Sequence, residues 1–257
     1  MARKQRNYRV EMVNTSSIVL IPGLLCTADL FRDQIAAFPP EALMVADTVS
    51  DDSIAAMAER LLAGAPPRFV LCGLSMGGYV ALEVARRAPE RVAGLAVVAT
   101  SARPDTAEQT AVRHRLVALG RDKGIAAVAE ALSSRLLGPQ ARQDEGQRDR
   151  VAAMAGVIGI ETFARQQAAI IGRPDQRQAL SGLAMPTHVL VGTADEIIPP
   201  DCSHEMAAAI PKARLTTVEA GGHLLSMEAP DLVTQALAAL LAGSRPLAAQ
   251  LEAGPNM

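Results

Sequence analysis

The sequence contains no tryptophan, and aromatic residues make up only 2% of its 257 residues. Proteins that hold single-stranded nucleic acid stack its bases on aromatic side chains, and attraction to any phosphate backbone requires a surplus of positive charge. The formal net charge here is −2. The composition therefore argues against nucleic acid as a partner.

The sequence also lacks an apolar run long enough for a membrane-spanning helix, which needs about 20 residues. The first clear run begins at Ile18 and is broken by Pro22 and Gly23. A basic cluster over residues 3–9 is followed by a polar, mixed stretch and not by the apolar core of a signal peptide. We therefore expect a solvated N-terminal tail and no association with a membrane.

Cysteine is scarce, since Cys26, Cys72 and Cys202 are the only three. An odd number of cysteines in a chain of this length favours a reducing compartment, so we predict a cytoplasmic protein. No cysteines or histidines have the paired spacing of a metal-binding motif. We expect neither a metal nor another cofactor.

Short apolar runs recur with helical segments between them, as in a mostly parallel sheet flanked by helices. The expected strands cover residues 17–21, 42–46, 68–72, 92–99, 188–191 and 214–218, and the expected helices include residues 53–63, 76–88 and 230–241. A chain of this length buries one sizeable core. We predict one α/β domain over residues 1–257 that ends in a flexible tail over residues 243–257.

The pattern changes between residues 101 and 182. Ala-rich helical stretches such as 124–137 and 160–171 follow one another there without a clear strand. An insertion between two strands of a parallel sheet lies over the carboxyl edge, where α/β proteins bind their ligands. We predict that residues 101–182 form a helical cap.

The segment Gly73-Leu74-Ser75-Met76-Gly77 contains the pattern G-x-S-x-G between a predicted strand and a predicted helix. A sharp strand-to-helix turn of this kind holds a serine in a strained conformation with its hydroxyl exposed above the sheet. Its position at a helix N-terminus favours negative charge that develops during a reaction. Ser75 is the candidate nucleophile.

A serine nucleophile needs a base, and the base needs an acceptor that orients it. Among the four histidines, His223 follows two glycines in a loop after the strand over 214–218. Asp195 comes just past the strand over 188–191, with Glu196 as the adjacent rival. We predict His223 as the base and Asp195 as the orienting acid, because both lie where parallel strands end.

The other three histidines have less favourable positions. We expect structural or surface positions for His114, His188 and His204. A second oxyanion donor is expected in the loop after the first strand, which begins with Pro22-Gly23. The backbone N–H groups of Leu24 and Met76 are the predicted oxyanion hole.

With these motifs, the chain resembles the α/β-hydrolase family over about residues 17–241, especially its small cap-bearing esterases and lactonases. The order Ser75, Asp195, His223 along the chain is that family's order. The chain departs from the family in having Pro22-Gly23 where many members have His-Gly. It also lacks the Asp-x-Arg-Gly-x-Gly stretch that often follows the next strand. The resemblance implies the α/β-hydrolase fold and a Ser-His-Asp catalytic triad.

The function predicted from these residues is a serine hydrolase that cleaves a carboxylic ester of a small or medium substrate through an acyl-enzyme on Ser75. A lactone, a thioester or a carbon–carbon bond next to a ketone would place an oxyanion at the same point, so these substrates remain alternatives. A non-catalytic ligand-binding protein of the same fold is another. An arginine of the predicted cap is a candidate for binding a substrate carboxylate, although a solvated positive face is the simpler interpretation; the candidates are Arg103, Arg113 and Arg115. The Ala-rich cap helices also leave a homodimer possible.

Overall fold

The computed structural model describes residues 17–244. The predicted N-terminal tail lies outside the described residues, as does all of the predicted C-terminal tail except Gly243 and Ser244. Those two residues belong to helix α9 (Pro230–Ser244), which continues three residues beyond its predicted end.

A six-stranded sheet forms the centre of the molecule, with every strand parallel to its neighbours. The strands, in the order in which they lie in the sheet, are β2 (Leu43–Val45), β1 (Ser17–Ile21), β3 (Phe69–Leu74), β4 (Val92–Val98), β5 (Thr187–Gly192) and β6 (Ala213–Val218). The predicted strands all exist, with bounds shifted by at most two residues. The predicted α/β class with a parallel sheet is therefore confirmed.

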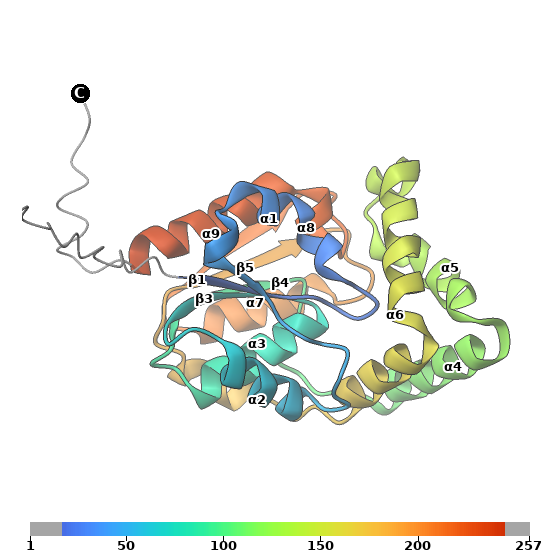
Figure 1. The fold of residues 1–257 in the computed structure, drawn as a ribbon, viewed down its shortest axis with the longest axis horizontal. Helices are drawn as coiled ribbons and strands as arrows, with labels where there is room; N and C mark the ends of the chain where they lie inside the picture. The colour runs from blue at the N-terminus through green and yellow to red at the C-terminus, as the bar shows by residue number, and fades with distance from the viewer. Residues whose placement is uncertain (1–16, 245–257) are drawn as a thin grey trace, which may run out of the picture.

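Helices cover both faces of this sheet (Figure 1). On one face lie α1 (Arg32–Ala37), α8 (Leu225–Glu228) and α9, together with the short helices η1 (Ala28–Phe31), which contacts α1 and α8, and η2 (Pro40–Ala42), which contacts β1. On the other face lie α2 (Ile54–Gly64), α3 (Met76–Arg87) and α7 (Pro200–Ala209). Parallel strands buried on both sides explain the near-continuous apolar runs in the sequence.

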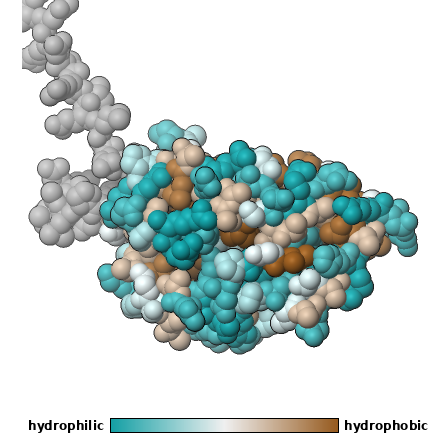
Figure 2. Space-filling model, turned by 90° about the horizontal axis from the view of Figure 1, so that it is seen from below, coloured by the Kyte–Doolittle hydropathy of each residue, from teal (hydrophilic) through white to brown (hydrophobic). Residues whose placement is uncertain are grey.

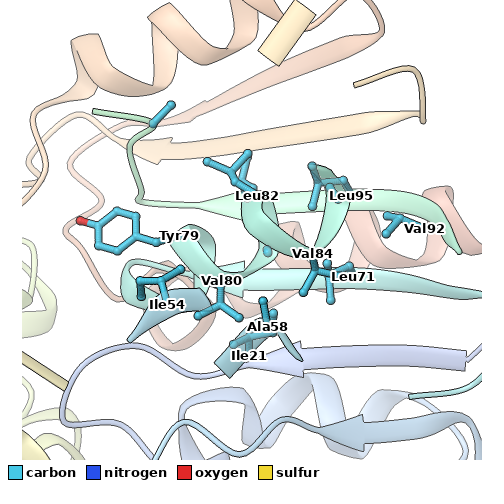
Figure 3. Packing of buried hydrophobic residues seen from close by; sticks show 14 of the residues in the cluster. Ile21, Ile54, Ala58, Leu71, Tyr79, Val80, Leu82, Val84, Val92 and Leu95 are labelled. Carbon is cyan, nitrogen blue, oxygen red and sulfur yellow. The ribbon is translucent and has the colours of Figure 1, made fainter. Parts of the chain in front are cut away.

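The two faces have separate cores, because successive side chains of a strand point to opposite sides. In β3, Leu71 belongs to the core under α2 and α3, whereas Val70 and Cys72 belong to the core under α1 and α9. Figure 3 shows part of the first core, with Val84 of α3 beside Leu71 and Val80 near Ile54 and Ala58 of α2. The sheet is therefore a rigid platform for the loops at its carboxyl edge.

The chain between β4 and β5 is helical and contains no strand among its residues, all of which are described. It consists of α4 (Ala107–Lys123), α5 (Ile125–Leu136), η3 (Ala141–Gln143), α6 (Glu145–Ile171) and η4 (Arg177–Gly182). Helices α4, α5 and α6 pack together beside the end of the sheet (Figure 1). We call residues 107–171 the cap segment.

Two features of the cap segment were not predicted. Helix α4 is largely solvent-exposed, although Leu116, Val117 and Leu119 pack against the buried residues of α5 and α6, and Thr106 and Gln109 form a reciprocal capping box at its start. Helix α6 is kinked at Gly159, whose φ of 69° is open to glycine and strained for other residues. The predicted helix over 160–171 is only the part of α6 that follows this kink.

Among residues 17–244, no helix is both long and apolar enough to cross a membrane. Figure 2 shows one face of the molecule, where hydrophobic surface occurs as patches between hydrophilic areas. The large apolar side chains that are exposed come from separate elements: Val49, Val112, Val157, Leu215 and Leu232.

Candidate active site

Ser75 lies in the sharp turn between β3 and α3, with φ 56° and ψ −116°. This positive φ is strained for a residue with a side chain, and strain of this kind is common at functional sites. The turn exists because its glycines allow close backbone contacts. A Cβ on Gly73 would lie 2.1 Å from the Gly77 carbonyl oxygen, and one on Gly77 would lie 2.0 Å from the Ile21 carbonyl oxygen.

The backbone of Ser75 is held from both sides. Its N–H donates to the Val98 carbonyl at 2.9 Å, and its carbonyl accepts the Thr100 hydroxyl at 2.7 Å. Both partners lie at the carboxyl end of β4. These bonds fix the strained turn relative to the neighbouring strand.

Asp195 and His223 are in direct contact. The distance between His223 Nδ1 and Asp195 Oδ2 is 2.8 Å, and the two residues are 2% and 6% exposed, respectively. A carboxylate only accepts hydrogen bonds, so Nδ1 carries the proton and the lone pair of the neutral ring is on Nε2. The other carboxylate oxygen, Oδ1, accepts the N–H groups of Ile197 and Ile198 at 2.8 and 2.9 Å. These bonds fix the orientation of the Asp195 carboxylate, which in turn fixes the orientation of the His223 imidazole.

The rival acid and the other histidines lie elsewhere. Glu196 is exposed and pairs with Arg142 at 2.7 Å. His114 and His204 are also exposed, and His188 Nε2 on β5 lies 2.8 Å from the Thr216 hydroxyl. Within residues 17–244, no three His, Cys, Asp or Glu side chains cluster as a metal site would require.

The loop that carries His223 is fixed by Glu228, which the sequence analysis did not single out. The Glu228 carboxylate accepts the N–H groups of Gly222 and Leu224 at 2.9 and 3.0 Å, and that of Gly138 at 2.8 Å. The His223 N–H donates to the Leu136 carbonyl at 3.1 Å. The C-terminal end of α5 and the histidine loop are thus joined by hydrogen bonds.

The loop after β1 passes beside Ser75. A Cβ on Gly23 would lie 3.4 Å from the Ser75 Cβ, so the backbone that leads to Leu24 is close to Ser75. Met76 is the first residue of α3, and such a residue has no partner for its N–H within the helix. In the described part of the chain, neither the Leu24 nor the Met76 N–H has a hydrogen-bond acceptor. Both predicted oxyanion donors are thus free.

A buried glutamine of α6 holds this loop. Gln166 Oε1 accepts the Leu25 N–H at 3.1 Å, and its Nε2 donates to the Thr48 carbonyl at 3.1 Å. Leu25 has a φ of 61°. No motif in the sequence identifies Gln166; the only signal is a Gln-Gln pair within an apolar stretch of the helix.

A cavity of about 210 Å³ lies between the cap segment and the carboxyl edge of the sheet. Ser75 and His223 both line it, together with Leu24, but no hydrogen bond between the two side chains is present among the described residues. Such bonds are often long in unliganded enzymes and shorten when substrate binds. The remaining lining is mostly apolar and comes from the loop after β1, from α4 to α6 and from the loops after β5 and β6: Leu25, Cys26, Val112, Leu116, Leu132, Leu136, Ile170, Ile197, Ile198 and Leu224.

The three arginines considered from sequence differ in position. Arg113 lines the cavity, as does Arg135 of α5. Arg103 pairs with Glu205 and Asp201 on α7, and Arg115 is exposed and is not part of the cavity wall.

The chain is similar in sequence and in fold to known hydrolases. The chain is 30% identical over 184 residues to a pimeloyl-[acyl-carrier protein] methyl ester esterase of Xanthomonas oryzae pv. oryzae, a match that covers 68% of this chain and 72% of the relative. A thermophilic esterase from Thermogutta terrifontis, solved with malate bound, superposes with a TM-score of 0.81 at 30% identity and covers 90% of this chain and 91% of its own. The enol-lactonase of Burkholderia xenovorans LB400 has a TM-score of 0.74 at 25% identity, over 89% and 92% of the two chains.

The sequence pattern of one family extends over nearly the whole described chain. The model of the alpha/beta hydrolase family matches residues 18–236, from β1 to the middle of α9. The fold, the strained serine turn and the similar hydrolases are consistent with this match. The chain belongs to the alpha/beta hydrolase family.

Proposed function

We propose that the protein is a serine hydrolase that cleaves a carboxylic ester of a small substrate through an acyl-enzyme on Ser75. The observation that carries the proposal is the buried hydrogen bond between Asp195 and His223, at a cavity that Ser75 also lines. A histidine fixed in this tautomer, next to a serine in a strained turn, has the geometry of nucleophilic acyl transfer.

In this mechanism, Ser75 Oγ attacks the carbonyl carbon of the ester while His223 Nε2 takes the hydroxyl proton. The carbonyl oxygen becomes an oxyanion, which the backbone N–H groups of Leu24 and Met76 stabilise. Loss of one such donor costs about 3 kcal/mol of transition-state stabilisation. Asp195 stabilises the protonated imidazole without itself taking the proton.

The tetrahedral intermediate collapses when the bond between the carbonyl carbon and the alcohol oxygen breaks, and His223 gives its proton to that oxygen. Water then attacks the acyl-enzyme, with His223 again as the base, and releases the acid and free Ser75. Only water is needed as co-reactant. The apolar lining supplies a small, water-poor site in which the hydrogen bonds to the oxyanion are strong.

Two similar proteins support ester hydrolysis, because the Xanthomonas and Thermogutta relatives are both esterases. The enol-lactonase similarity favours a lactone as the second candidate substrate, since a lactone is a cyclic ester and follows the same steps. Thioester and carbon–carbon bond hydrolysis and non-catalytic ligand binding have no such support. The cytoplasmic location and the homodimer stay predictions of the sequence.

The experiment that tests the proposal compares wild type with Ser75→Ala on p-nitrophenyl esters of increasing acyl length and on simple lactones. We expect turnover by wild type, with a preference for short chains because the cavity is small, and its loss in Ser75→Ala. A fluorophosphonate probe should label wild type at Ser75, with the adduct located by peptide mass spectrometry. Folded wild-type protein that neither turns over these substrates nor takes the label would refute the proposal.

A further inference from the structure

One wall of the cavity is polar and positively charged. Arg113, which lines it, donates from Nε and Nη2 to the two carboxylate oxygens of Asp105 at 2.6 and 3.2 Å. Asp105 also accepts Arg173 Nη1 at 2.6 Å, and its side chain is only 1% exposed. Among residues 17–244, no other carboxylate pairs with either arginine. Two guanidinium groups share one carboxylate, so this buried cluster has one surplus positive charge.

Gln167 adds an unsatisfied hydrogen-bond donor to the same wall. Its Oε1 accepts Arg113 Nη1 at 3.0 Å. Because a guanidinium only donates, this bond fixes which end of the amide faces Arg113 and leaves Nε2 on the other side. Gln167 is 1% exposed and lines the cavity, and Nε2 has no acceptor within the described chain. A buried donor without a partner is costly, which indicates a missing acceptor.

Tyr79 completes the wall. Its ring packs under the Arg173 guanidinium, 4.3 Å from the centroid, and Figure 3 shows its hydroxyl directed away from the labelled core residues. Tyr79 lines the cavity, and in the described residues its hydroxyl makes no hydrogen bond. Arg113 likewise uses three of its five N–H groups in the bonds given above. The wall therefore offers donors from Arg113, Gln167 and Tyr79.

We propose that this wall binds a carboxylate of the substrate, so that the preferred substrates are small esters with one free carboxylate, such as monoesters of dicarboxylic acids. A carboxylate only accepts hydrogen bonds, and its single negative charge balances the single surplus positive charge of the cluster. A phosphate group would bring about two negative charges at neutral pH and leave one unbalanced. This inference rests on the proposed function for the reaction at Ser75, and the wall can also be tested by binding alone.

The kinetic test compares monomethyl glutarate with the methyl ester of glutaramic acid, which has nearly the same shape but an uncharged amide at the far end. Wild type should prefer the carboxylate ester in kcat/KM by roughly tenfold or more, as charged hydrogen bonds in a buried site imply. Gln167→Glu keeps the oxygen that accepts from Arg113, replaces the free donor with an acceptor and removes the surplus charge. It should lower the preference about tenfold, again by loss of charged hydrogen bonds.

Gln109→Glu is the matched control, because it makes the same chemical change at another glutamine of the cavity. The Gln109 Oε1 accepts the Thr106 N–H in the capping box of α4, and a glutamate keeps that bond. Its position is exposed, so solvent and salt screen the added charge. The preference should change several-fold less than in Gln167→Glu. Tyr79→Phe, which removes only the hydroxyl, is a second variant and should lower the preference a few-fold.

Equal kcat/KM values for the two esters in wild type would overturn the proposal, and so would equal effects of Gln167→Glu and Gln109→Glu. If no ester is hydrolysed, glutarate itself is titrated by calorimetry into wild type and Gln167→Glu. Tighter binding of glutarate to wild type would then support the wall while the proposed reaction fails. Absent or equal binding to the two proteins would overturn the wall as well.

Discussion

The side chain of Gln166 is hydrogen-bonded to the backbone of Leu25, with 3.1 Å between Oε1 and the amide nitrogen. The two residues are 141 positions apart, and the bond joins the cap segment to the loop after β1. Leu24, the proposed oxyanion donor, directly precedes Leu25. The position of this donor therefore depends on the cap segment as well as on the sheet.

Gln166→Leu should reduce both stability and turnover. The substitution leaves the Leu25 N–H and the Thr48 carbonyl without partners, a cost of about 1–3 kcal/mol for each buried group. Because the loop then loses its fixed position, kcat should fall while KM changes less. Ester kinetics and urea unfolding measure the two effects. Gln140→Leu, at an exposed glutamine, is the control, and an unchanged kcat in Gln166→Leu would contradict the proposed link.

Asp195→Asn tests the orientation of the histidine. The asparagine oxygen can still accept the N–H groups of Ile197 and Ile198, but its amide nitrogen then faces His223 Nδ1 and favours the wrong tautomer. In a Ser-His-Asp triad such a change lowers kcat by about 10⁴-fold. Ester turnover gives the rate, and circular dichroism checks the fold. Near-normal turnover by a folded variant would exclude Asp195 from the mechanism.

Two glycine substitutions should have opposite effects on stability. Gly77→Ala forces a Cβ to within 2.0 Å of the Ile21 carbonyl oxygen, and overpacking of this kind costs about 1–3 kcal/mol or more. Gly156 lies exposed within α6, with nothing within 4 Å of an added Cβ. There, alanine should stabilise the protein by about 0.5–1 kcal/mol through its helix propensity. Urea unfolding of both variants tests the contrast, and a stable Gly77→Ala protein would show that the serine turn is adaptable.

The thiol at the cavity should be unreactive. Cys26 lines the cavity, but burial raises the pKa of its thiol to about 12, and the pKa of Cys72 is raised to about 12 for the same reason. Only the thiolate is a good nucleophile, so at pH 8 almost none of the reactive form is present. Iodoacetamide should leave both cysteines unmodified in the folded protein and alkylate them in guanidinium chloride, as followed by mass spectrometry. Rapid alkylation of Cys26 in native protein would refute this.

The sheet and the serine turn could be predicted from sequence because their signals are local. Apolar runs mark the strands, and the pattern G-x-S-x-G between a strand and a helix marks the turn, although Gly77 is also required by a contact with the distant Ile21 carbonyl oxygen. The contact between Asp195 and His223 depends on long-range structure, yet its approximate place could be predicted. The two residues follow β5 and β6, which are neighbours in a parallel sheet and end at the same edge.

The polar groups from the cap segment could not be predicted in the same way. Gln166 and Gln167 become wall and support residues only through the packing of α6 against α4, α5 and the loop after β1. The kink at Gly159 sets the direction of the second half of α6, and one glycine in an Ala-rich stretch does not reveal a kink. Arg113 was one of three candidates from sequence, and only the packed helix distinguishes it from Arg103 and Arg115.

The hydrogen bonds at the C-terminal end of α5 limit which part of the cap segment can be replaced by that of a relative to change substrate specificity. Leu136 bonds to the histidine loop directly and Gly138 bonds to it through Glu228, so this end of the helix is shared between the cap segment and the proposed reaction centre. A chimaera that takes residues 107–135 from a relative would change the cavity and keep these bonds. A larger residue at position 138 would place a Cβ 2.4 Å from the Ala220 carbonyl oxygen and disturb the loop of the proposed base together with the pocket. When cap segments are exchanged between relatives to change substrate preference, the natural boundary therefore lies between residues 135 and 136, one residue before the end of α5.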